Sequence, residues 1–146
     1  MPDVRDIAGL RRRLRAAVEE AREQSVERRA RTAAAERDYE QFLSERAVPV
    51  FHDFANVLGG EGHPFQVSTP ARSVRLTSAK SGEEFIELEL DSSQDPPQVV
   101  GRSSRGRGRR MVTSERPLKP RTPIAEITED DVVQFLLAEI VAFVER

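Results

Sequence analysis

The feature that most constrains this chain is a long run near its N-terminus that holds almost nothing to stop a helix. Residues 3–47 contain one glycine and no proline, and they are rich in alanine, arginine and glutamate, which all have high helix propensity. The run therefore predicts a single long helix. At 1.5 Å per residue, such a helix would extend roughly 65 Å.

Apolar residues in the first part of this run follow the spacing of a coiled coil. They recur at intervals of three and four residues and form what we call the arm seam: Ile7, Leu10, Leu14, Ala17 and Ala21. A coiled coil or a helical hairpin buries a seam of this kind. The same register then places Gln24, Arg28 and Arg31 on the seam, so we expect the middle of the helix to be solvated.

The arm seam has more than one explanation. Residues 1–47 can form a helical arm that binds a second copy of the chain or a helical protein partner through the seam. Alternatively, the helix folds back on itself as a hairpin, or the arm frays. We expect a partner surface, because the solvated middle separates the seam from the rest of the chain.

A second, shorter helix is predicted just after the arm. Pro49 has no backbone N–H and its ring clashes with the carbonyl of Glu45 in a continuous helix, so we expect a kink or a fresh start there. Apolar residues with helical spacing follow: Val50, Phe51, Phe54, Val57 and Leu58. Gly59 and Gly60 come next and predict a left-handed C-cap for this helix.

From residue 63 the apolar period changes from helical to two, which is typical of strands. In 84–91, Ile86, Leu88 and Leu90 share one face and the acids Glu87, Glu89 and Asp91 share the other. Strands are expected at 65–69, 73–77, 84–91, 98–103 and 110–114. A flexible tip around Gly106 and Gly108 would join the last two. This pattern predicts an antiparallel meander of four or five strands with one wet face.

The C-terminal part of the chain predicts a connector and a helix. Pro117–Pro123 holds three prolines and is expected to run extended along the surface. Thr128 and Asp131 have capping-box spacing, and the very apolar segment that follows, 132–144, is expected to cover the sheet or bind a partner. The sequence thus predicts an α+β protein with a helical arm, 1–47, and one α+β domain, 48–146. This order of elements resembles several small bacterial folds, including the nucleoid-associated YbaB type, and no residue motif assigns a family.

Positive and negative charges are segregated along a nearly neutral chain. The 25 acids and 23 bases give a net charge of −2, which argues against coating a nucleic acid or an anionic membrane with the whole surface. Residues 101–121, however, hold eight bases and one acid, whereas residues 83–95 hold six acids and no base. Any electrostatic specialisation is therefore expected to be local.

The basic segment 101–110 has two interpretations. Its arginines can bind phosphates, because guanidinium groups fork onto phosphate oxygens, and this predicts nucleic-acid binding as the alternative function. They can instead lie across the sheet from Glu87, Glu89 and Asp91 as ordinary ion pairs on the wet face. The arginines concerned are Arg102, Arg105, Arg107, Arg109 and Arg110.

Nothing in the sequence points to an enzyme. The chain has no cysteine, which removes disulfides, thiolate zinc sites and cysteine nucleophiles and leaves a reducing cytoplasm as the expected location. His52, Asp53, Glu61 and His63 are the only candidate metal or acid–base group, and their spacing matches no known metal motif. We expect no cofactor, metal or small-molecule substrate. No membrane segment is expected either, because 132–144 is shorter than the roughly 20 residues that a bilayer requires.

Overall fold

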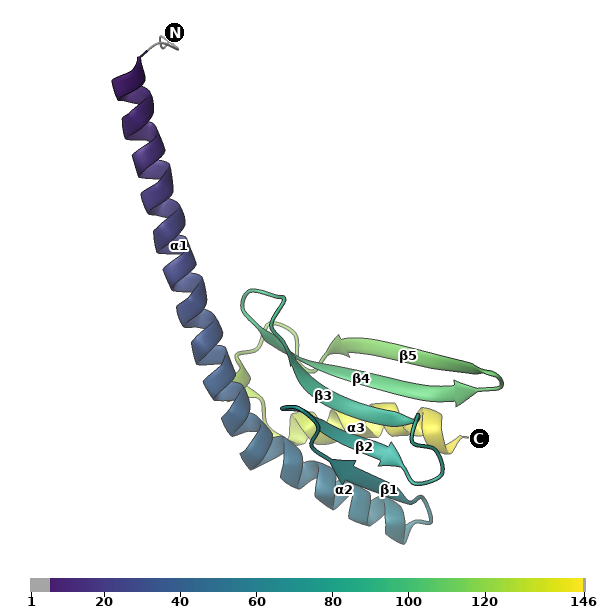
Figure 1. The fold of residues 1–146 in the computed structure, drawn as a ribbon. Coiled ribbons are helices and arrows are strands. Elements are labelled where there is room, and N and C mark those ends of the chain that lie inside the picture. The colour runs from purple at the N-terminus through teal and green to yellow at the C-terminus, as the bar shows by residue number, and fades with distance from the viewer. Residues whose placement is uncertain (1–5, 146) are drawn as a thin grey trace.

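The structure is a computed structural model that describes residues 6–145, and its element order confirms the predicted α+β class (Figure 1). The predicted helical residues 3–5 lie outside this range. The helical elements are α1 (Ile7–Phe42), a π-helical turn η1 (Leu43–Ala47), α2 (Val48–Gly60), a short 3-10 turn η2 (Ile124–Glu126) and α3 (Glu129–Val144). The strands are β1 (Phe65–Ser68), β2 (Val74–Ser78), β3 (Phe85–Asp91), β4 (Gln98–Arg107) and β5 (Arg110–Pro117).

The five strands form one antiparallel sheet in the order β1-β2-β3-β4-β5, so the predicted meander is confirmed. The hairpin between β4 and β5 is longer than expected. Gly106 lies inside β4 and pairs with Met111, and Arg107 faces Arg110 across the turn. Gly108 has a φ of 64° in that turn, a left-handed conformation that glycine adopts without a steric penalty.

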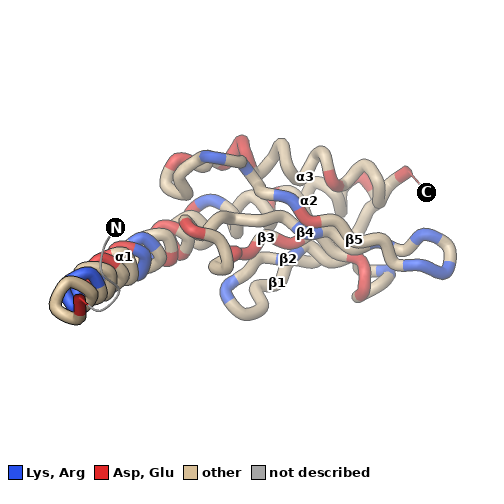
Figure 2. The backbone as a smooth tube through the Cα atoms, turned by 90° about the horizontal axis from the view of Figure 1, so that it is seen from above, with Lys and Arg blue, Asp and Glu red and all other residues tan. Residues whose placement is uncertain are grey.

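Helices α2 and α3 cover one face of the sheet and leave the other face open (Figure 2). Alternation along the strands turns apolar side chains toward the helices: Val74, Leu76, Ile86, Leu88 and Val99 are all buried. The helices meet them with Phe51 and Leu58 from α2 and with Val132, Leu136 and Ile140 from α3. The most apolar segment of the sequence thus packs on the sheet with one side of α3.

Of the two alternatives predicted at Pro49, the structure shows the kink and not the fresh start. The backbone stays helical from α1 through η1 into α2, since Phe42, Leu43, Ala47 and Val48 all have right-handed helical dihedral angles. The π-helical turn bends the rod, and Arg46 within it donates hydrogen bonds to the carbonyls of Ala125 and Ile127, at 3.0 and 2.9 Å. These two bonds tie the bend to the segment that leads into α3.

The end of α1 belongs to the core of the body. Tyr39, Phe42 and Ala47 are fully buried, and the Tyr39 hydroxyl donates a hydrogen bond of 2.6 Å to the carbonyl of Arg72. Burial raises the pKa of the Tyr39 phenol, so this donor stays protonated. The projecting part of α1 therefore ends well before residue 47.

The C-cap prediction for α2 was wrong by two residues. Gly59 and Gly60 are helical, and the left-handed position is Gly62, with a φ of 84°. The Gly62 N–H donates to the Gly59 carbonyl at 3.2 Å, and the His63 N–H donates to the Leu58 carbonyl at 2.8 Å. This is the bond pattern of a Schellman motif. The capping box of α3 was predicted correctly, with Thr128 and Asp131 bonded reciprocally.

Gly101 in β4 lies directly against Phe135 of α3. A Cβ atom added there would lie 2.3 Å from both Cε2 and Cζ of Phe135. On the same ring, the guanidinium carbon of Arg116 lies 4.8 Å from the centroid. Because a packed aromatic ring and the sheet backbone leave no room for a methyl group, only glycine fits this position.

We expect Gly101→Ala to lower the free energy of unfolding by about 1–3 kcal/mol, the usual cost of overpacking a core. Urea unfolding followed by far-UV circular dichroism measures the change. Gly106→Ala in the same strand is the matched control, since the nearest atom to its new Cβ would be Glu84 Oε2 at 3.6 Å. Equal midpoints for the two variants would contradict the close contact with Phe135.

Candidate interaction surfaces

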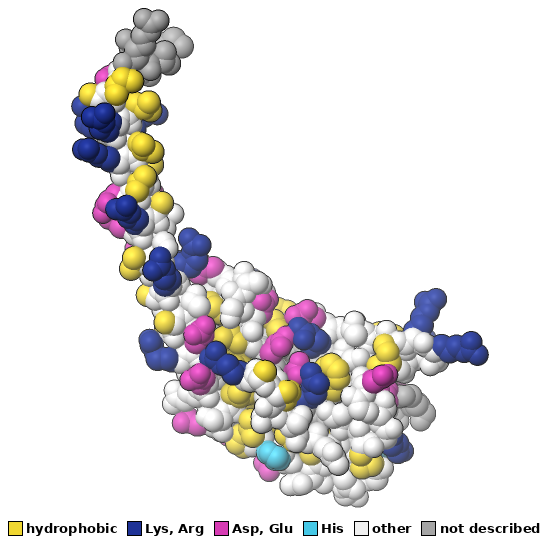
Figure 3. Space-filling model, viewed as in Figure 1, with side chains coloured by type: hydrophobic (Ala, Val, Ile, Leu, Met, Phe, Trp, Pro, Cys, Tyr) yellow, Lys and Arg dark blue, Asp and Glu magenta, His cyan; other side chains and the backbone are white. Residues whose placement is uncertain are grey.

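The arm seam lies exposed on a helix that projects from the body. Ile7, Leu10 and Leu14 are 60%, 57% and 62% exposed, and Ala17 and Ala21 are exposed as well. Figure 3 shows apolar side chains along one side of the outer arm and arginines along the other. The structure thus places all five predicted residues on one continuous helix. The hairpin alternative is wrong, because Ile7–Phe42 is uninterrupted and α2 continues from its end without folding back along the arm (Figure 1).

Beside the buried Tyr39 and Phe42, two ion pairs also join α1 to the body. Arg31 holds Asp95 of the β3–β4 loop with two hydrogen bonds, Nε to Oδ1 at 3.0 Å and Nη2 to Oδ2 at 2.9 Å. The hydrogen bond from Arg31 lowers the pKa of the Asp95 carboxyl, and the same bond raises the pKa of Arg31. A second pair joins Arg72 to Glu40 at 2.9 Å. The arm N-terminal to Arg31 stands clear of the sheet (Figure 1).

A row of alternating charges crosses the open face of the sheet, which we call the ionic ladder. The strand register brings together Arg75, Glu87, Arg102 and Glu115, one from each of β2 to β5. Glu87 is only 3% exposed, and it contacts Arg75 at 2.8 Å and Arg102 at 3.6 Å. This buried carboxylate therefore has a cation on each side.

Arg102 is the most connected residue of the ladder. Besides Glu87 it pairs with Glu89 of β3 and, at 3.5 Å, with Glu115 of β5. Burial alone would lower the pKa of Arg102, but the charges of Glu89, Glu115 and Glu87 raise it overall. The ion-pair interpretation is thus right for Arg102. It is wrong for Asp91, which faces Gln98 and instead accepts hydrogen bonds from Ser93 and Gln94 in the following turn.

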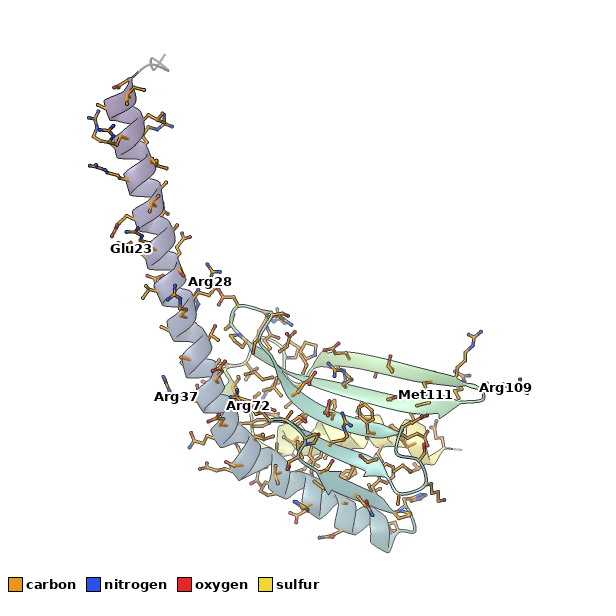
Figure 4. The ribbon with its side chains drawn as sticks, viewed as in Figure 1. Glu23, Arg28, Arg37, Arg72, Arg109 and Met111 are labelled. Atoms are coloured by element: carbon orange, nitrogen blue, oxygen red, sulfur yellow. The ribbon has the colours of Figure 1, made fainter. Side chains whose placement is uncertain are left out.

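The other four arginines of the basic segment gather at the end of the β4–β5 hairpin and form what we call the arginine tip: Arg105, Arg107, Arg109 and Arg110. Within residues 6–145, none of them makes an ion pair. Figure 2 shows the tip as a cluster of positive charge at the end of the body away from the arm, and Figure 4 shows Arg109 projecting from it. A groove of about 560 Å³ beside the tip is lined by Arg105 and Arg107 together with Glu84 and Glu145, so acidic side chains lie next to two of the four tip arginines.

The candidate acid–base group does not assemble in the described part of the chain. His52, Asp53, Glu61 and His63 are all exposed, and residues 6–145 contain no group of three or more side chains able to hold a metal ion. In the same range, no helix combines the length and apolarity needed to cross a membrane.

One exposed apolar surface was not identified from the sequence. The side of α3 that faces away from the sheet exposes Leu137, Val141 and Val144, at i, i+4 and i+7. The signal was present, because a helix that is hydrophobic all round has more apolar side chains than one sheet face can cover. The sequence alone does not show which side of such a helix stays uncovered.

Comparisons with known proteins gave no match. No model of a protein family matches the chain, and neither a curated protein nor a solved structure is similar to it. A function for this chain therefore has to be inferred from the surfaces described above, chiefly the arm seam and the arginine tip.

Because Arg102 is ion-paired and the tip arginines are exposed, alanine substitutions at the two places should lower the free energy of unfolding by different amounts. Arg102→Ala should lower the free energy of unfolding by about 1 kcal/mol or more, because buried Glu87 loses one of its two cations and Glu89 loses its partner. Arg109→Ala should change it by less than about 0.5 kcal/mol, as for other exposed surface positions. Urea midpoints by circular dichroism compare the two, and equal values would contradict a structural role for the ionic ladder.

Proposed function

We propose that this protein is a non-enzymatic interaction module that self-associates, or binds a helical protein partner, through the arm seam. The observation that carries the proposal is the exposure of Ile7, Leu10 and Leu14 along one side of a helix that stands clear of the body. The body, a sheet covered on one face by α2 and α3, acts as the folded platform that holds this helix.

The physical reason is that, without a partner helix, the apolar side chains of the seam stay exposed to water. Helices in proteins owe most of their stability to the packing of an apolar face rather than to propensity. Burying a leucine or isoleucine side chain is worth about 1.5–3 kcal/mol relative to leaving it exposed. A partner helix along the seam would bury three such side chains together with Ala17 and Ala21, which allow close approach.

The mass of the protein in solution tests this proposal. We expect the wild type to have a multiple of the 16.4 kDa chain mass and Leu10→Asp/Leu14→Asp to have the mass of one chain, because a buried carboxylate without a partner is strongly unfavourable. Light scattering coupled to size exclusion measures it. Refractive index should give the concentration, since the chain has no tryptophan and one tyrosine.

Val26→Asp is the matched control for this double variant. Val26 is 62% exposed, as much as Leu14, but it lies off the seam, so its substitution should leave the mass unchanged. Far-UV circular dichroism of each variant confirms that the body is folded. A wild type with the mass of a single chain, or an oligomer indifferent to Leu10→Asp/Leu14→Asp, would contradict self-association through the seam.

A second candidate function, nucleic-acid binding, is favoured by the arginine tip. Its arginines make no ion pairs among the described residues, unlike Arg102, and the facing pair Arg107 and Arg110 concentrates like charge at the end of a hairpin. Exposed guanidinium groups of this kind bind phosphate oxygens bidentately. Acidic residues elsewhere on the body would repel the phosphate backbone of the nucleic acid and so orient the tip toward it.

Salt dependence tests the second candidate. If the tip binds phosphates, a labelled duplex should bind at about 50 mM salt and far more weakly at about 200 mM, with a log–log slope near −0.9 per phosphate contacted. Arg107→Ala/Arg109→Ala/Arg110→Ala should flatten this slope, and Arg22→Ala/Arg29→Ala/Arg37→Ala, which removes the same charge from the arm, should not. Fluorescence anisotropy measures both. Absence of binding at the lower salt would rule this function out.

A further inference from the structure

We propose that the partner of the arm seam is a second copy of this chain, and that the two arms pair antiparallel with Leu10 against Ala21 and Leu14 against Ala17. This inference rests on the proposed function and names the partner and its orientation. Two independent features of the exposed arm support it: the distribution of side-chain size along the seam and the distribution of charge beside it.

Side-chain size changes along the seam from large to small. The outer residues Ile7, Leu10 and Leu14 are large, and Ala17 and Ala21, nearer the body, are small. A parallel pair in register would set leucine against leucine at one end and alanine against alanine at the other, so the helices would be held apart where the alanines leave gaps. An antiparallel pair sets each leucine against an alanine, which gives one interaxial distance along the whole contact.

Charge changes sign along the same stretch of helix. Residues 7–15 contain four arginines and no acid, whereas residues 16–24 contain three glutamates and one arginine. In the antiparallel arrangement, 7–15 of one copy lies opposite 16–24 of the other. A parallel pair would instead set the basic halves together and, one heptad beyond Ala21, Arg28 against Arg28. Antiparallel pairing therefore replaces repulsion with attraction.

The flanking residues also select the register. With Ile7 and Leu14 at heptad position a, Arg13 and Glu20 occupy position g, which flanks the seam where interhelical ion pairs form. Pairing Leu10 with Ala21 brings Arg13 of each copy beside Glu20 of the other. An antiparallel register shorter by one heptad would bring Arg13 beside Arg13. Two acids, Asp6 of one copy and Glu27 of the other, approach each other at the ends of the contact. There the Asp6 carboxylate already accepts a hydrogen bond from the Gly9 N–H, at 3.0 Å, as the N-cap of α1.

In this register the contact ends where the arm reaches the β3–β4 loop. Ile7 of the second copy would come level with Gln24, seven residues or about 10 Å before Arg31, the residue that holds the β3–β4 loop through Asp95. The second body would lie at the opposite end of the paired arms. Figure 1 shows the outer arm extending away from the sheet. The β3–β4 loop borders the arm only from Gln24 onward, in a groove that Ser93 and Asp95 line together with Gln24, Arg28 and Arg31.

Charge reversal at the flanking positions tests the orientation. At about 50 mM salt, Arg13→Glu and Glu20→Arg should each raise the dissociation constant of the dimer roughly tenfold, since each turns two attractive pairs into repulsive ones. Arg13→Glu/Glu20→Arg in one chain should restore the wild-type value, because the pairs re-form with their signs exchanged. An equimolar mixture of the two single variants should also recover dimers. Sedimentation velocity over a dilution series measures all four.

Arg12→Glu and Glu19→Arg are the matched controls. They make the same charge changes one position earlier, on the side of the helix away from the seam, and should leave the dissociation constant unchanged. An oligomer that loses its mass with Leu10→Asp/Leu14→Asp but ignores both single reversals, or whose double reversal only adds their effects, overturns the antiparallel pairing and leaves the proposed function intact. A wild type that stays a single chain at all concentrations overturns self-association itself.

Discussion

The burial of Tyr39 and Phe42 in the core of the body is the contact on which the rest of the structure depends. Both side chains come from the last turns of α1 and are fully buried, and the π-helical turn that follows is fixed by the two hydrogen bonds of Arg46. Because α1 is one uninterrupted helix, anchoring its end sets the direction of everything before it. The outer arm projects because its base is held, and the same packing that completes the core presents the seam to solvent.

The sheet shows how one segment of sequence can supply two kinds of arginine. Arg102 lies in the middle of β4, where neighbouring strands bring Glu87, Glu89 and Glu115 within reach, so its charge is neutralised locally. The hairpin then continues past the end of the acidic part of β3, and within residues 6–145 no acidic strand pairs beside Arg107, Arg109 and Arg110. The length of the β4–β5 hairpin relative to β3 therefore separates ladder arginines from tip arginines.

Much of this fold could be predicted from short sequence patterns, because strand alternation and helix capping depend on residues that are close in the sequence. Alternation in 84–91 identified the face of β3 that the helices cover, and the spacing of Thr128 and Asp131 identified the start of α3. Features that depend on contacts between two or more elements could not be predicted from the sequence. Gly59, Gly60 and Gly62 all satisfy the requirements of a C-cap, and packing of α2 on β1 and β2 decides among them. The partners of Arg102 and of Asp91 depend on strand register, in which a shift of one residue moves every side chain to the other face.

The two candidate surfaces lie at opposite ends of the molecule, and this placement bears on how they act together. The arm leaves the body at the end of the sheet where the β3–β4 loop lies, whereas the arginine tip lies at the other end (Figure 2). Arms that pair antiparallel would therefore hold two bodies apart with both tips uncovered, which doubles the number of arginines available to one extended polyanion without any contact between the tips. Rising salt would weaken both the Arg13–Glu20 pairs and the contacts of the tips, since both are exposed charges. Apolar burial along the seam does not share that dependence, so in the proposed dimer added salt would weaken the charged contacts and leave the contacts of the leucines.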